Sequence, residues 1–184
     1  MLVVGATSDW RPSTLARPLP PVDLLESLWL TLRPATGVWD WVQSEILTDT
    51  GGIHNPDHAH LMDANIGVLW ASSGIAKQGR VVLGQAEQLM FRAGGWQKAR
   101  QEQQMREWFG DEPTYLITLA ADNCAQCSDA QFCTRVEHEL YHIAQATDEY
   151  GAPKFTQDGL PKLYLSGHDV EEFVGVGQAT TYSS

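Results

Sequence analysis

Basic residues are scarce in this 184-residue chain, in which 12 Lys and Arg stand against 23 Asp and Glu and leave a net charge of −11. A net negative charge repels the phosphate backbone of nucleic acids, so we expect no nucleic acid partner. Long hydrophobic runs are also missing. No stretch approaches the roughly 20 apolar residues of a membrane span, and residues 1–10 lack the pattern of a secretory signal. We therefore expect an unexported protein without a membrane partner.

Cysteine is rare and clustered, with Cys124, Cys127 and Cys133 inside ten positions. An odd, clustered set excludes the framework of a secreted disulfide scaffold and favours a reducing compartment. Two interpretations of the cluster stay open. The thiols could form a structural zinc site with His54, His58 or His60, or Cys133 could be a small buried hydrophobic residue, which is the commoner role.

The first 50 residues differ in composition from the rest. Four of the nine prolines lie in residues 11–21, which predicts an extended arm, and apolar residues from Val22 to Leu32 recur at the spacing of an amphipathic helix. The same N-terminal segment contains Trp29, Trp39 and Trp41, which suggests a small satellite core or a docking surface. Because Thr50-Gly51-Gly52 interrupts the pattern, we predict an extension over residues 1–50 and a domain over 51–184.

Helix and strand signals alternate in the remaining chain, which predicts an α+β fold. Ile66–Trp70 and Arg80–Gly84 suggest a β-hairpin, and Tyr115–Ala121 is the clearest strand pattern. Further elements are predicted as a helix over 97–109, a helix capped by Ser128-Asp129, a short strand over 159–165 and a last helix opened by Ser166 and Asp169.

Residues 138–142 carry the most informative motif, His138-Glu139-Leu140-Tyr141-His142. On a helix, histidines four residues apart lie one turn above each other and can bind one zinc ion, while the glutamate between them lies beside the metal's water and serves as a general base. A helical wheel centred on Leu140 places Phe132, Val136, Ile143, Ala144 and Thr147 on one side and the two histidines opposite. The alternative is a pair of ordinary surface histidines.

A catalytic zinc ion normally has three protein ligands and an open position for water. The segment Gly167–Phe173 offers His168 as the third ligand, with Glu172 four positions later orienting a ligand histidine through a hydrogen bond. The reverse assignment, with Glu172 or Glu171 on the metal and His168 stabilising the transition state, stays open. A plain amphipathic helix with solvated acidic residues is the alternative to both.

Two motifs, Val136–His142 and Gly167–Phe173, together resemble the metallopeptidase family of phages and prophages. The resemblance extends upstream to Ile66–Trp70 and Leu83-Gly84 and covers about residues 55–177. It implies a minimal zincin-like fold, a small, mostly antiparallel sheet packed on an active-site helix, with zinc as the cofactor. It also implies a location in the bacterial host cytoplasm or in the virion.

The resemblance predicts a zinc-dependent metallopeptidase, with His138, His142 and His168 as ligands and Glu139 as general base. Tyr141, Tyr150 and Tyr164 are candidate oxyanion donors by residue type alone. If the enzyme binds its peptide substrate along a sheet edge, through main-chain hydrogen bonds, we expect weak specificity for the substrate's side chains. The alternative is a zinc-stabilised structural or adaptor protein of a phage particle or assembly pathway, which would contact phage structural proteins through the Trp-rich N-terminal segment.

Overall fold

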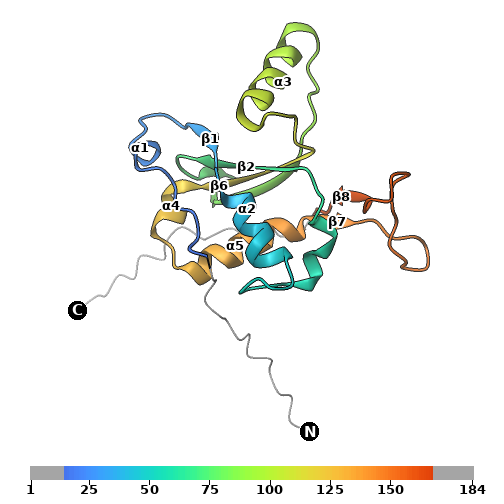
Figure 1. The fold of residues 1–184 in the computed structure, drawn as a ribbon. Helices are drawn as coiled ribbons and strands as arrows, with labels where there is room; N and C mark the ends of the chain where they lie inside the picture. Colours follow the sequence, from blue (N-terminus) through green and yellow to red (C-terminus); the bar gives the residue numbers. More distant parts are fainter. Residues whose placement is uncertain (1–14, 168–184) are drawn as a thin grey trace.

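A four-stranded sheet organises residues 15–167, which are the residues described by a computed structural model of the protein (Figure 1). Its strands run in the order β1 (Leu32–Pro34), β2 (Ile66–Ala71), β6 (Tyr115–Ala120) and β5 (Gly84–Gln88). The β1–β2 and β5–β6 pairs are antiparallel, whereas β2 and β6 are parallel. With mixed helices and small, mostly antiparallel sheets, the α+β prediction is confirmed.

Helices cover one face of this sheet, with α2 and α5 lying side by side beneath it (Figure 1). The helical segments are α1 (Val22–Leu25), α2 (Val38–Val42), the π-helix η1 (Gln43–Leu47), the 3-10 helix η2 (Pro56–Leu61), α3 (Gly95–Phe109), α4 (Ala121–Gln126) and α5 (Asp129–Tyr141). The helix α3 projects from the body and has no buried residue. Two small hairpins, β3 (Ile75–Lys77) with β4 (Arg80–Val82) and β7 (Ile143–Gln145) with β8 (Leu163–Leu165), complete the described fold.

The core lies between the sheet and α5. The α5 side chain Phe132 is fully buried and packs against Trp41 of α2 and Trp70 of β2, with ring centroids 5.4 and 6.3 Å apart. Aromatic pairs at this separation stabilise a core beyond their burial. Residues from both sides of position 50 contribute to this one core. The division of the chain near residue 50 stays a prediction.

The predicted pairing of Ile66–Trp70 with Arg80–Gly84 is wrong. Both edges of β2 are occupied by β1 and β6, and the later run divides at Leu83. Its first part, β4, pairs with β3 across Gln78-Gly79, where both residues have positive φ (52° and 78°), as a type I′ hairpin turn requires. Its second part begins β5 and pairs with β6. A strand pattern indicates a strand but not its distant partner.

The predicted helix over Val22–Leu32 is largely wrong, because helical structure ends at Leu25 and Leu32 begins β1. Of the apolar residues in that pattern only Leu24 is buried, while Leu28 and Trp29 are 92% and 81% exposed. The pairing of Leu32 with Ala71 is a long-range contact that helical periodicity does not encode. By contrast, the helix over 97–109 and the strand over 115–121 are confirmed.

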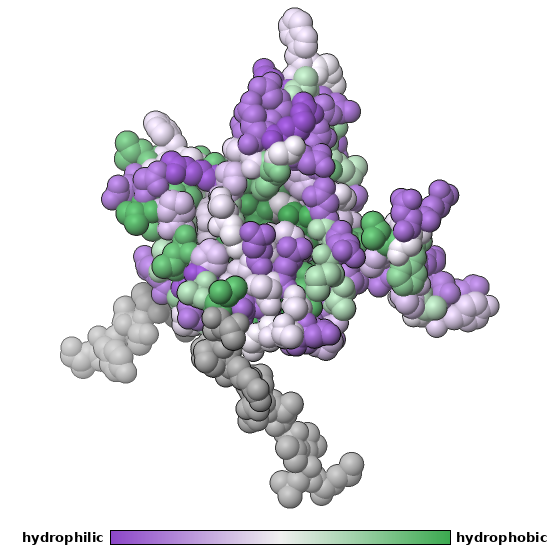
Figure 2. Space-filling model, in the orientation of Figure 1, coloured by the Kyte–Doolittle hydropathy of each residue, from purple (hydrophilic) through white to green (hydrophobic). Residues whose placement is uncertain are grey.

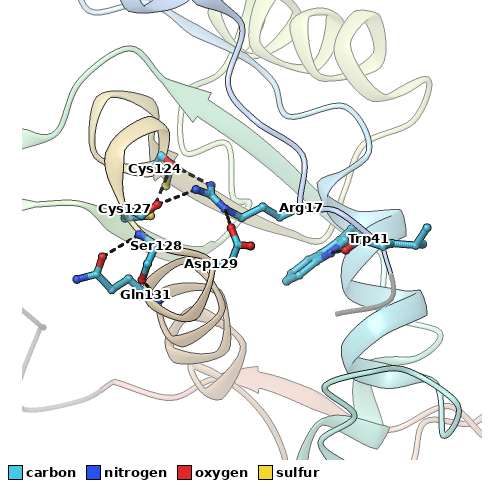
Figure 3. Close-up of polar contacts among 8 residues, drawn as sticks. Arg17, Trp41, Cys124, Cys127, Ser128, Asp129 and Gln131 are labelled. Atoms are coloured by element: carbon cyan, nitrogen blue, oxygen red, sulfur yellow. Dashed lines mark hydrogen bonds and ion pairs between the residues drawn. The ribbon is translucent and has the colours of Figure 1, made fainter. Parts of the chain in front are cut away.

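The N-terminal arm is fastened to the start of α5 through Arg17, whose side chain is only 8% exposed (Figure 3). Its guanidinium donates to the Cys124 and Cys127 backbone oxygens at 2.9 and 2.7 Å and pairs with Asp129 at 2.7 Å. It also lies 4.9 Å from the centroid of the Phe132 ring, within cation–π distance. These contacts fix the α4–α5 junction and therefore the direction of α5.

Every helix formed by residues 15–167 is too short or too polar to cross a membrane.

Candidate metal centre

The helix α5 begins as the sequence predicts. The Ser128 side chain accepts from the Gln131 backbone N–H, and the Gln131 side chain accepts from the Ser128 N–H, so the two form a capping box. Phe132, Val136 and Leu140 are buried along one stripe of the helix. His138 and His142 are half-buried on another side. The capped, anchored helix therefore turns both imidazoles away from the apolar stripe, as the helical wheel predicts.

The two histidines face each other through the same ring atom. The Nε2 atoms of His138 and His142 are 3.3 Å apart, and the rings are nearly perpendicular at 85°. On the other side of the second ring, His142 Nδ1 lies 3.1 Å from the Ser166 backbone oxygen. A carbonyl accepts only from a protonated Nδ1, so in the neutral tautomer that makes this contact the His142 Nε2 lone pair is directed toward His138.

Glu139 completes the cavity between α5 and β5. Its side chain is 4% exposed, and it lines a cavity of about 80 Å³ together with His138, His142 and residues of β4 and β5. The carboxylate lies directly against Gly84, where an added Cβ would meet Glu139 Oε1 and would stand 3.1 Å from Cδ. Only glycine at this position leaves room for the carboxylate, so β5 and α5 jointly fix where Glu139 lies.

Polar contacts on a neighbouring side of α5 connect the helix to the loop around η2. The Asn55 side chain donates to Glu137 at 2.8 Å and to the Tyr141 hydroxyl at 3.2 Å, and that hydroxyl donates to Asp57 at 3.0 Å. His58 is fully buried against the Tyr141 ring, with Nε2 3.6 Å from Glu137 Oε1. The contacts with His58 and Asn55 lower the pKa of Glu137 and outweigh its burial. Through His58, Asn55 and Asp57, the loop around η2 thus packs against α5 and supports it.

Comparison with known families gives one match. Residues 39–182 match the model of the family described as Putative phage metallopeptidase. The chain belongs to this family. No curated protein and no solved structure matches the chain. The resemblance drawn from the two motifs is therefore confirmed, and membership in a metallopeptidase family implies a metal ion.

The histidine geometry fits the metal that the family name implies. Two nitrogens bound at about 2.0–2.1 Å to one tetrahedral zinc ion lie roughly 3.3 Å apart. The separation of the two Nε2 atoms is 3.3 Å. A ligating histidine also commonly donates its other ring N–H to a backbone carbonyl, as the Ser166 contact allows. Zinc is thus compatible with the two side chains present, of which His142 is oriented by the Ser166 contact.

The predicted third ligand, His168, and the acidic residues Glu171 and Glu172 lie outside the described residues. Within residues 15–167, no three His, Cys, Asp or Glu side chains are grouped to hold one metal ion. The described chain does lead toward this site, because the Ser166 N–H donates to the His142 backbone oxygen at 2.7 Å. The sequence position of His168, two residues later, is compatible with a ligand supplied from this segment.

The helix α5 is shorter than the wheel assumed, because it ends at Tyr141 and the chain turns at His142 into β7. Ala144 and Thr147 therefore do not extend its buried stripe. Of the tyrosine candidates for an oxyanion donor, Tyr141 is directed to Asn55 and Asp57, and Tyr150 is 86% exposed. Sequence reasoning missed the role of Gly84, although the resemblance already included Leu83-Gly84.

The cysteine cluster is part of the core rather than of a metal site in the described residues. Cys124 is fully buried and Cys133 is 8% exposed, and all three thiols are free. Burial raises the pKa of Cys124 to about 12 and that of Cys133 to about 11. These values favour the neutral thiol, whereas a zinc ligand and a redox nucleophile must be thiolates.

Alkylation of the folded protein at pH 8 should therefore modify Cys124 and Cys133 slowly, because the thiolate reacts and burial holds both thiols protonated. We expect at least a tenfold slower modification than in the same protein unfolded in denaturant. Mass spectrometry of iodoacetamide-treated protein measures the rate at each site, with the partly exposed Cys127 as internal reference. Equal rates at Cys124 in folded and unfolded protein would contradict its burial.

Proposed function

We propose that the protein is a zinc-dependent metallopeptidase that hydrolyses peptide bonds in the host cytoplasm or the virion. The observation that carries the proposal is the pair of Nε2 atoms 3.3 Å apart beside the buried carboxylate of Glu139 in one cavity. Two imidazoles that can share one ion and a buried acid beside them are parts that a water-activating metal site requires, together with a third ligand. In this proposal the fold is zincin-like.

His138 and His142 hold zinc through Nε2, and His168 is the proposed third ligand, with Glu172 orienting a ligand histidine. Glu172 or Glu171 as the third ligand is the alternative assignment. When bound, zinc acidifies a coordinated water and polarises the scissile carbonyl. Glu139 accepts a proton from the attacking water and transfers it to the leaving amine. Gly84 keeps the carboxylate in position for both transfers.

The edge of the main sheet offers a place for the substrate. Strand β5 is outermost in the strand order and lines the cavity through Gly84, Gln85 and Ala86. An extended peptide paired with this edge by main-chain hydrogen bonds would bring a peptide bond to the cavity. Such pairing reads little of the substrate's sequence, which supports the prediction of weak side-chain specificity.

The direct test measures zinc and hydrolysis in the same preparation. The purified full chain is expected to bind about one zinc per molecule and to cleave an unstructured protein such as casein, and a chelator should abolish both. Zinc re-addition should restore them. Absence of cleavage by the zinc-loaded chain, across a set of unstructured proteins, would contradict the proposal and favour the structural or adaptor alternative, to which the exposed Leu28 and Trp29 lend support.

Gly84→Ala provides a second test, since an added methyl group would collide with the Glu139 carboxylate. We expect a loss of about 1–3 kcal/mol in the free energy of unfolding, as for other overpacked sites, together with reduced hydrolysis at unchanged zinc content. Denaturant unfolding and metal analysis measure these effects. Gly94→Ala is the matched control, because a Cβ there meets no atom within 4 Å and its φ of −115° suits alanine. Wild-type activity in Gly84→Ala would contradict the role of Gly84.

A further inference from the structure

A second cavity, of about 180 Å³, lies against the same edge strand. Its walls include Thr118 and Gln85, which are paired neighbours on β6 and β5. Because side chains alternate along a strand, Thr118 stands on the opposite face of the sheet from Leu119, which is in the core beneath α5. The second cavity therefore opens on the face of the sheet that α5 does not cover.

The two cavities share Val82, Gly84 and Gln85. Val82 and the start of β5 therefore form a wall common to both cavities. A peptide paired alongside β5 would direct successive side chains to alternate faces of the extended sheet. One side chain would point toward the cavity of Glu139, and the next would point toward the face that carries Gln85. Cross-strand neighbours on one face have Cβ atoms about 4.5–5.5 Å apart, so a long side chain opposite Gln85 reaches this cavity.

We propose that the second cavity is a specificity subsite that accepts one apolar side chain of an extended peptide substrate. The inference rests on the proposed peptidase function. It refines the prediction of weak specificity, because it assigns a preference to one position of the substrate.

The size and lining of the cavity define the side chain it takes. Small-molecule sites usually occupy about 300–1,000 Å³, so 180 Å³ suits one side chain of leucine or phenylalanine size. Apolar residues from four segments form the wall, among them Leu30, Ile75 and Val82, and none of the described lining residues is charged. A charged substrate side chain would lose its hydration there without gaining a partner.

The rim of the cavity is apolar and exposed. Leu30 is 56% exposed and Ile75 is 42% exposed. Figure 2 shows hydrophobic residues gathered on the surface around α1 and β1, the side of the molecule to which Leu32 belongs. Covering these side chains with an apolar substrate residue removes them from water and therefore favours binding.

Alanine-rich peptides with a single leucine moved through successive positions test the subsite. Binding is measured to zinc-loaded Glu139→Gln protein, and cleavage is measured with zinc-loaded protein that retains Glu139. We expect leucine to be favoured over alanine about tenfold at one position and over aspartate by more. Leu30→Asp and Ile75→Asp, each introduced into both proteins, should abolish this preference. Leu28→Asp is the matched control, because Leu28 is 92% exposed, belongs to the same segment and does not line the cavity.

The outcomes separate the two proposals. An unchanged leucine preference in both Leu30→Asp and Ile75→Asp overturns the subsite even if cleavage proceeds. If the protein binds leucine peptides preferentially through Leu30 but cleaves none of them, the peptidase function is overturned and the subsite is supported. If the protein neither binds nor cleaves these peptides, both proposals are overturned. Two rim variants, each at a partly exposed position, keep the test valid if one of them fails to fold.

Discussion

Replacing Glu139 with glutamine is expected to reduce hydrolysis by about 10²–10⁴-fold while the bound zinc is retained. Glutamine keeps the shape of the side chain and fits the space beside Gly84, but it cannot accept the water proton. Because Glu139 lies beside the two imidazoles in the proposed site rather than on the metal, the zinc content should stay near that of the wild type. Peptide cleavage rates and metal analysis on the same sample measure both quantities.

Glu149→Gln, at an exposed position beyond α5, is the control for loss of one carboxylate and should leave the rate unchanged. Two results would contradict the assignment of Glu139 as general base. Either hydrolysis at the wild-type rate in Glu139→Gln, or loss of zinc from that variant, would require a different role for the carboxylate.

Replacing His138 with alanine is expected to abolish zinc binding at micromolar concentrations and to remove hydrolysis entirely. Zinc that binds only the folded chain stabilises it by about 2.7 kcal/mol when its concentration is 100 times the dissociation constant. The wild type should therefore melt at a higher temperature when zinc is added, and His138→Ala should show no such shift. Thermal unfolding with and without zinc, together with metal analysis, tests this coupling.

His54→Ala is the matched control, since His54 is a half-buried histidine that contacts the Ile46 backbone oxygen and does not line the cavity. It should keep the zinc-induced shift in melting temperature. A zinc-induced shift that survives in His138→Ala would show that the stabilising ion binds elsewhere in the chain.

Short-range sequence signals predicted several parts of this fold correctly. The Ser128 cap, the apolar stripe of α5 and the outward-turned histidine pair all depend on residues within a few turns of each other. The strand over 115–120 and the helix over 95–109 are equally local. In each case the pattern describes the element's own geometry, with a period of 3.6 or 2 residues, so no distant partner is needed to recognise it.

Local patterns gave wrong predictions where long-range strand pairing decides the structure. The stripe from Leu24 to Leu32 satisfies helical periodicity, yet the chain leaves the helix after Leu25 because Leu32–Pro34 pairs with the edge of β2. The run from Arg80 divides between a local hairpin and β5 because β2 already has two neighbours. His58, which no local pattern marks as buried, is fully buried because η2 packs against α5.

The sequence by itself determined the family, the α+β class and the one-turn spacing that lets two imidazoles share an ion, since each of these follows from motif and local periodicity. Only the tertiary structure decided that Gly84 must lack a side chain, that β5 forms the wall of the cavity and that a second, apolar cavity adjoins it. These features arise where residues far apart in the chain meet, as Gly84 and Glu139 do. Their contacts depend on how sheet and helix pack, which no local pattern in the chain encodes.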